Sequence, residues 1–368
     1  MLDVWPPLPI SLYQIERTNS GGDNIIAALE RNDRVCRMTL KLDLQWEKVF
    51  DATQEPFPEL THLSLYSDIE VPPVVLDSFM GGSAPCLQYL LLYRVPIPGL
   101  PKLLLSATDL VLLDLCYIPN SGYISPEAIV TCLSTLPRLE TFNLEFESPR
   151  SHPNRESRRL PPPTRSVLPS LIKLHFTGVS GYLEDLVARI DPPLLNCLEI
   201  VLCRRLLFDT PQLILFISRT PTLEVHDRVR LDFWDLYIEA YSGDHLKFKI
   251  LCRRLERQLS SMAQICTSLF PRSSIHMVER LIIWERRYME LEGQDDIEDS
   301  QWLELLRPFT GVKDLYLPKE SAPRIAPSLQ ELVGGRATEV LPALQSIFLE
   351  EFPPSGPVKE AIGKFVAA

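Results

Sequence analysis

Large apolar residues recur along the chain with the spacing L-x-x-L-x-L. The stretch FPELTHLSLY, residues 57–66, contains one copy, in which Leu60, Leu63 and Leu65 occupy the three apolar positions. Further copies begin at Val35, Leu87, Leu110, Leu139, Leu171, Leu195, Val278, Val312 and Leu344. The alternation of apolar and polar residues within each copy predicts a β-strand with one buried side.

Helix-start signals lie between these predicted strands. In SGYISPEAIVTCLSTLP, Ser125 suits an N-cap and Pro126 the first helical position. FDTPQLILFISRTP repeats this order with Thr210 and Pro211, and IAPSLQELVGG predicts a helix from Pro327 to Gly334. Strand, loop and helix recur at intervals of roughly 23–34 residues, apart from the wide interval between Leu195 and Val278, and this spacing matches the period of leucine-rich repeats. The sequence therefore predicts an α/β leucine-rich-repeat solenoid, right-handed, with a parallel inner sheet and helices outside.

The repeat register makes specific predictions about strands and burial. Strands are expected around Ser64, Leu91, Asp114, Asn143, His175, Glu199, Ile282, Tyr316 and Phe348. Leucines expected to be almost fully buried are Leu63, Leu90, Leu113, Leu174 and Leu315. The Asn or Cys that usually follows the strand is replaced by Asp68, Val95, Ile118 and Glu147 in successive repeats. Variable repeat lengths and an irregular curve are therefore expected.

The wide interval between Leu195 and Val278 contains strand-like material of another kind. Residues 228–251 alternate, break at Ser242-Gly243-Asp244 and alternate again, which predicts an antiparallel hairpin projecting from the regular array. The next segment places apolar residues on one helical stripe, which favours a core helix over a partner-binding helix. Its members are Leu251, Leu255, Leu259, Met262 and Cys266.

Two further segments complete the predicted domain organisation. Residues 1–34 are expected to form an N-terminal cap with a short amphipathic helix, and residues 35–368 the irregular solenoid. Residues 147–166 are polar, basic and rich in proline, which predicts an exposed loop. Its Arg155, Arg158 and Arg159 suit an acidic partner or a phosphate group, and a merely solvated loop is the alternative.

Composition narrows the classes of partner. A net charge of −11 disfavours nucleic acid and anionic lipid as partners. The eight cysteines form no C-x-x-C pair, which favours small buried thiols in a reducing compartment, the cytoplasm or nucleus. The N-terminus lacks the features of a secretory signal, and no apolar run is long enough to predict a membrane span.

Motifs of catalysis and metal binding are absent from the sequence. It contains no G-x-x-x-x-G-K-[ST], G-x-G-x-x-G, G-x-S-x-G or H-E-x-x-H. The acidic run at Asp295, Asp296, Glu298 and Asp299 lacks the spacing of a calcium loop and suits a helix start instead. We predict a protein that is not an enzyme and needs no cofactor or metal.

The remaining candidate site is the face of the sheet opposite the buried leucines. Residues predicted there as partner-binding are His62, Tyr66, Tyr89, Tyr93, Asn143, Glu145, Lys173, His175, Arg280 and Trp284. Tyrosine, tryptophan and arginine frequently anchor protein interfaces. The alternative is that tyrosines on adjacent strands only stack on one another.

Several long phrases resemble the leucine-rich region of F-box proteins from mushroom-forming fungi. They are LDVWPPLPI, NIIAALERNDRVCRMTL, EPFPELTHLSL, DSFMGGSAPCLQ, LPKLLLSATDLVLLDL, SGYISPEAIVTCLS, LVARIDPPLL, FDTPQL, QWLELLRPFTGVKDLYL and APSLQELVGGRATEVLPALQSIFLE. The resemblance implies a substrate receptor of a cullin-based ubiquitin ligase.

In that family an F-box precedes the LDVWP segment, whereas this chain begins at Met1 with the equivalent of that segment. Two functions therefore remain open: a non-catalytic substrate adaptor, or a stand-alone scaffold or decoy that binds a partner without ubiquitination. The expected partner is a protein of unknown identity. Docking to the ligase adaptor is expected only with an F-box upstream of Met1.

Overall fold

The structure of the protein is a computed structural model. It describes residues 8–14, 22–42, 46–69, 74–75, 78–96, 102–147, 164–203, 210–223, 227–234, 237–243, 245–251, 255–269, 277–286, 299–318, 322–331, 340–350, 360 and 363. The chain divides into two compact units. The first comprises residues 1–178 and 182–195, and the second residues 179–181 and 196–368.

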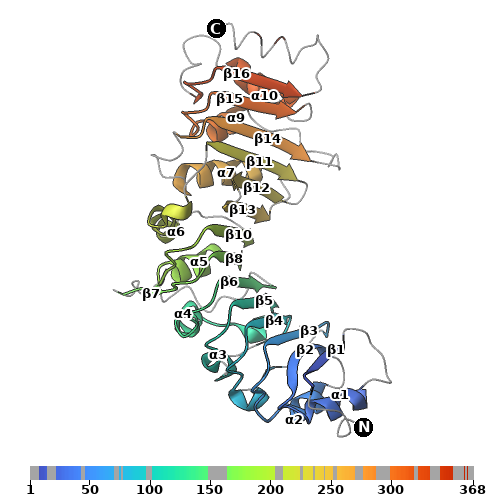
Figure 1. Ribbon diagram of the computed structural model, residues 1–368. Helices are drawn as coiled ribbons and strands as arrows, with labels where there is room; N and C mark the ends of the chain where they lie inside the picture. The colour runs from blue at the N-terminus through green and yellow to red at the C-terminus, as the bar shows by residue number, and fades with distance from the viewer. Residues whose placement is uncertain are drawn as a thin grey trace. The chain divides into compact units, whose positions relative to one another are not determined.

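The first unit contains a parallel sheet with helices on one face (Figure 1). In spatial order its strands are β1 (Ile10–Gln14), β2 (Val35–Leu42), β3 (His62–Ser67), β4 (Tyr89–Tyr93), β5 (Leu112–Ile118), β6 (Thr141–Phe146) and β8 (Lys173–Gly178). Its helices are α1 (Gly22–Leu29), α2 (Trp46–Ala52), η2 (Phe79–Gly82), α3 (Lys102–Ser106), η3 (Asn120–Gly122), α4 (Pro126–Leu133) and α5 (Ser180–Val187), the last of which crosses the unit boundary. Strands β7 (Ser166–Val167) and β9 (Ile190–Asp191) form a separate parallel pair.

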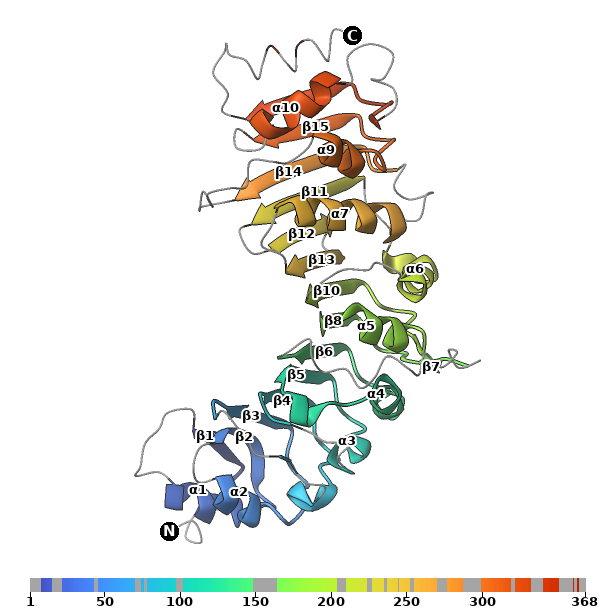
Figure 2. The same cartoon turned by 180° about the vertical axis from the view of Figure 1, so that it is seen from behind.

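The second unit also places its helices on one face of a sheet (Figure 2). In spatial order its strands are β10 (Cys197–Cys203), β13 (Leu246–Leu251), β12 (Tyr237–Ser242), β11 (Arg228–Trp234), β14 (Arg280–Arg286), β15 (Asp314–Pro318) and β16 (Ser346–Glu350). Its helices are α6 (Pro211–Ser218), η4 (Pro221–Leu223), α7 (Leu255–Leu269), α9 (Asp299–Leu306) and α10 (Ala322–Glu331). Strand β12 runs antiparallel to both of its neighbours, while the other strands are parallel.

The repeat register predicted from the sequence is confirmed. Every predicted strand centre lies within a parallel strand. The five test leucines, Leu63, Leu90, Leu113, Leu174 and Leu315, are at most 1% exposed. Their side chains fill the space between the sheet and its helices, because alternate residues of a strand point to the same side.

Backbone hydrogen bonds also link the loops that lead into successive strands. The Gln88 amide donates to the Thr61 carbonyl at 2.9 Å, and the Val111 amide donates to the Gln88 carbonyl at 2.8 Å. Glu140 and Ile172 continue this ladder at 2.9 and 2.8 Å. In each case a carbonyl of one repeat accepts a hydrogen bond from an amide of the next repeat, just ahead of the strand of that next repeat. These hydrogen bonds fix where each strand starts.

The helix starts agree with the sequence in two cases, at Pro126 and Pro211, and depart from it in one. Ser125 caps α4, since its Oγ accepts a hydrogen bond from the Ala128 amide at 3.1 Å. Thr210 precedes α6, but its side chain makes no capping bond. Helix α10 begins at Ala322 rather than at Pro327, which lies inside it. The buried side chains of Ala322, Ile325 and Ala326 extend the apolar side of that helix ahead of the proline.

The residues that stand in place of the usual Asn after the strand are of two kinds, buried apolar side chains and ion-paired carboxylates. Val95 and Ile118 are buried and extend the apolar core. Asp68 and Glu147 are partly exposed and form ion pairs, Asp68 with Lys41 and Glu147 with Arg94 at 2.8 Å. Apolar packing and ion pairing thus replace an asparagine ladder in these repeats.

The antiparallel hairpin between residues 228 and 251 is confirmed, but its predicted projection is wrong. Strands β12 and β13 pair antiparallel and turn after Ser242, where Gly243 has a φ of +59°. The hairpin lies within the sheet, because β13 pairs with β10 and β11 pairs with β14. Buried residues on the helix side of all three strands, such as Leu231, Ile238 and Phe248, require this position.

The predicted core stripe of the following helix needs one correction. Helix α7 begins at Leu255, so Leu251 belongs to β13, where it is 41% exposed. Leu259, Met262 and Cys266 are buried as predicted. Several other predicted features lie outside the described residues: most of the loop 147–166, Asp295, Asp296 and Glu298, and Gly334.

Substitution of Leu113 tests the register against its neighbour Leu112. Leu113 is fully buried, whereas Leu112 lies half-buried on the opposite face. Leu113→Ala should lower the free energy of unfolding by roughly 2–5 kcal/mol through the cavity that it leaves. Leu112→Ala should cost less than about 1.5 kcal/mol, and urea unfolding followed by circular dichroism measures both. Equal losses would contradict the assigned faces.

Candidate functional site

The face of each sheet opposite the described helices is here called the open face. Strand register places the predicted residues of the first unit on it, with His62 beside Tyr89 and Tyr66 beside Tyr93. Asn143 aligns with His175 on β8, and Glu145 and Lys173 lie at the same alternate positions. Arg280 and Trp284 occupy the open face of the second unit. All ten are half-buried or exposed, and their role in binding stays a prediction.

Aromatic rings form a row on the open face of the first unit. The rings of His62 and Tyr89 stack with centroids 5.8 Å apart, and those of Tyr66 and Tyr93 lie 6.1 Å apart. The Thr61 hydroxyl contacts His62 Nδ1 at 2.8 Å and restricts the imidazole. Burial and the nearby Arg37 lower the pKa of His62, so the ring stays neutral at pH 7. This row is an apolar surface with polar tips.

Tyr117 extends the aromatic row and was missed in the sequence. It lies outside the alternate positions, but its backbone has a φ of 51° and the register of β5 shifts between Leu115 and Ile118. The centroid of its ring lies 5.1 Å from that of Tyr93, and the Tyr117 side chain is 42% exposed. A positive φ is unfavourable for tyrosine, and the local sequence does not predict this backbone conformation at Tyr117.

Polar groups gather beside the aromatic row on β5 and β6. Asp114 Oδ1 accepts hydrogen bonds from Cys116 Sγ at 2.9 Å and from Asn143 Nδ2 at 2.7 Å. The Asn143 Oδ1 atom is buried without a partner among the described residues. Burial and the Asp114 hydrogen bond raise the pKa of Cys116, so its thiol stays protonated and is a poor nucleophile.

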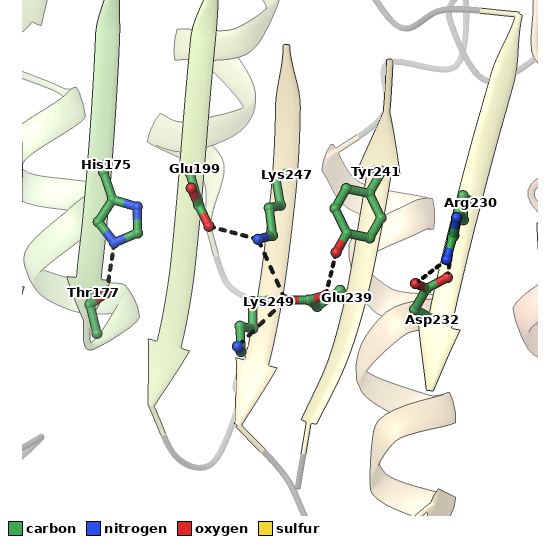
Figure 3. Close-up of polar contacts among 9 residues, drawn as sticks. All are labelled: His175, Thr177, Glu199, Arg230, Asp232, Glu239, Tyr241, Lys247 and Lys249. Atoms are coloured by element: carbon green, nitrogen blue, oxygen red, sulfur yellow. Dashed lines mark hydrogen bonds and ion pairs between the residues drawn. The ribbon is translucent and has the colours of Figure 1, made fainter. Parts of the chain in front are cut away.

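Glu145 completes this polar group. Burial raises the pKa of Glu145, His175 opposes that rise and the Asp114 carboxylate adds to it. His175 Nε2 contacts the Thr177 hydroxyl at 3.1 Å along the same strand (Figure 3). These contacts restrict the side chains of this polar group on the open face.

A network of ion pairs links β10, β13 and β12 on the open face of the second unit and is centred on Glu239 of the reversed strand (Figure 3). Glu239 Oε1 lies 3.5 Å from Lys247 Nζ and 3.4 Å from Lys249 Nζ. The Tyr241 hydroxyl donates to Glu239 Oε2, and Lys247 also contacts Glu199 at 2.9 Å. The Glu239 side chain is only 6% exposed although no described helix covers it, because its neighbours enclose it.

A second ion pair lies on β11. The Arg230 guanidinium donates to both oxygens of Asp232, at 2.6 and 2.7 Å. It also lies over the Trp284 ring, 5.3 Å from its centroid. The hydrogen bond to Asp232 raises the pKa of Arg230 and keeps it charged. The contacts with Asp232 and Trp284 therefore restrict the Arg230 side chain in the unbound protein.

The sequence template missed these network residues for a definite reason. Asp232, Glu239, Lys247 and Lys249 fall in the interval where L-x-x-L-x-L is absent. Their alternation with apolar residues, as in LKFKIL, was the available signal for their shared face. Their pairing across strands depends on the reversal at Gly243, which the sequence placed, and on the register, which it did not.

Among the described residues, no group of three or more His, Cys, Asp or Glu side chains could hold a metal ion. In the same part of the chain, no helix is both long and apolar enough to cross a membrane.

The strand order, the buried leucines and the loop ladder define a leucine-rich-repeat fold. No protein-family model and no curated protein matches the chain. Among solved structures, the leucine-rich repeat-containing protein LegL7 from Legionella pneumophila is similar, with 15% identity and a TM-score of 0.35. The match covers 90% of this chain and 98% of that one.

The raised pKa of Glu145 predicts a pH-dependent cost in stability. The folded state holds the proton at a pH where the unfolded carboxyl, with a pKa near 4.5, has lost it. Stability therefore falls as pH rises from below 4.5 through the raised pKa. Glu145→Gln should be more stable than the wild type at pH 7, and this difference should shrink at about pH 4.

Urea unfolding at the two pH values measures this difference. Glu140→Gln, at an exposed position before β6, is the control and should change stability little at either pH. A less stable Glu145→Gln protein at pH 7 would show that attraction to His175 outweighs burial.

Proposed function

We propose that this protein is a non-catalytic interaction solenoid that binds a protein partner on its open faces. One observation carries the proposal: aromatic and charged side chains on these faces are half-buried and held by mutual contacts, whereas the leucine face is packed against helices. Ordered side chains lose little conformational entropy when a partner binds.

The kinds of residue on the open faces support a protein as the partner. Tyr89, Tyr93, Arg230 and Trp284 belong to the residue types that contribute most to protein interfaces. The chain's net charge of −11 disfavours nucleic acid. The stacking of tyrosines on one another is compatible with binding, because the stacked rings keep an exposed edge.

The resemblance of the sequence phrases to fungal F-box proteins supports a more specific role. In that role the solenoid is the substrate-recognition region of a ubiquitin-ligase adaptor, and it acts inside the cell, in the cytoplasm or nucleus. A stand-alone scaffold or decoy is the alternative. The two roles differ in the fate of the partner, which gains ubiquitin in the first role and stays unmodified in the second.

Site-specific crosslinking tests the open face as the binding surface. A photoreactive benzoylphenylalanine replaces Tyr89 on the open face or, as a control, Leu105 of α3, which is 42% exposed. We expect Tyr89 to yield a discrete crosslinked partner in cells, and Leu105 to yield none. Tyr93→Ala should weaken the crosslink from Tyr89, because it removes part of the same surface.

Equal crosslinking from both positions, or none from Tyr89, would contradict the proposal. Once the partner is identified, co-expression with this protein separates the two roles. Ubiquitin chains on the partner, measured by immunoblotting with and without a proteasome inhibitor, support the adaptor. Their absence supports the scaffold.

A further inference from the structure

Two arginines lie side by side on the open face of the second unit. Strand register pairs Arg228 of β11 with Arg280 of β14. Arg228 is exposed and has no carboxylate partner among the described residues, and Arg280 Nε lies 3.7 Å from Asp314 Oδ2. Like charges directly opposite on neighbouring strands are destabilising. An anion placed between these guanidinium groups would relieve that repulsion.

Two carboxylates of this face are more deeply buried than the cations that pair with them. The Asp232 and Glu239 side chains are only 3% and 6% exposed. The cations that neutralise them are more accessible, with Arg230 at 35% and Lys247 at 31%. Two carboxylates of this face are also accessible, Glu199 at 33% and Asp314 at 28%, but each already pairs with a cation, Lys247 or Arg280. Arg228, which has no carboxylate partner among the described residues, is therefore available to a partner's carboxylate.

Aromatic rings hold these cations and provide an adjacent apolar surface. Lys249 Nζ lies 3.7 Å from the centroid of the Tyr237 ring, and Arg230 lies over Trp284. On β15 and β16 the rings of Tyr316 and Phe348 stack at 4.4 Å with an angle of 8° between their planes. Phe348 is 44% exposed. A ligand that combines carboxylates with apolar side chains would match both surfaces.

We propose that the open face of the second unit binds an acidic peptide segment of a partner protein. Carboxylates of the segment pair with Arg228 and Arg280, and its neighbouring apolar side chains lie against Tyr316 and Phe348. Charge complementarity is the basis of this assignment. The inference rests on the proposed function and specifies the chemistry of one partner segment.

Fluorescence anisotropy with the purified full chain tests the proposal. The probe is a fluorescein-labelled copolymer of glutamate and tyrosine, compared with a lysine–tyrosine copolymer and a single-stranded DNA of similar length. We expect saturable binding of the acidic copolymer alone, weakening as NaCl is raised because salt screens the charges. The double substitution Arg228→Ala/Arg280→Ala should weaken binding about tenfold or more.

Two controls keep this result interpretable. Arg138→Ala removes an exposed arginine of the first unit that pairs with Asp109, and it should bind the acidic copolymer like the wild type. Arg228→Ala alone should melt at the same temperature as the wild type or slightly higher, because it removes a repulsion. Weaker binding by a protein of unchanged or higher stability then reports on the site itself.

Three results would overturn the inference. They are equal affinity for the DNA, unchanged affinity of the double variant, and a lower melting temperature of Arg228→Ala. Crosslinking from Tyr89 in the absence of acidic-copolymer binding would leave the proposed function standing and remove only this inference. Binding of the copolymer without a crosslink from Tyr89 would leave this inference standing and remove the open face of the first unit as a binding surface.

Discussion

The alternation of side chains along each strand is the constraint on which the rest of the structure depends. Leu110, Leu113 and Leu115 are buried and hold one strand in place, and the same three positions recur in neighbouring repeats. Because a strand sends its other residues to the opposite side, packing places few demands on them. Tyr89 and Asp114 occupy such positions, so their identity can follow recognition rather than folding.

The reversed strand β12 shows how strongly register and charge depend on each other. The chain passes from β10 to β11, returns through β12 and β13, and then continues to β14. Glu239 thereby aligns with Lys249 on one side and with Asp232 on the other. A shift of one residue would turn Glu239 toward the leucine core without a cation. The ion pairs therefore favour a single register for this strand.

Much of the fold could be predicted from the sequence, because the apolar positions that form the core are local and repeated. Leu63 and Leu315 were placed correctly from spacing alone. Pro327 was misplaced because apolar packing of the preceding residues overrides the usual preference of proline for a helix start. Tyr117 and Glu239 were missed because their positions depend on a shifted register and on a strand reversal. Such long-range pairings leave little trace in a local pattern.

The cations on the open face of the second unit differ in whether they pair with a carboxylate of the same chain. This difference determines which of them can contribute to binding. Lys249 already neutralises a carboxylate that is almost fully enclosed, so a partner anion gains little by competing for it. Removing that lysine would leave Glu239 buried without one of its cations, which costs stability whether or not a partner is present. Arg228, in contrast, is exposed and neutralises no buried carboxylate among the described residues. The attraction available to an acidic ligand is therefore concentrated at β11 and β14, although cationic side chains extend over a wider surface.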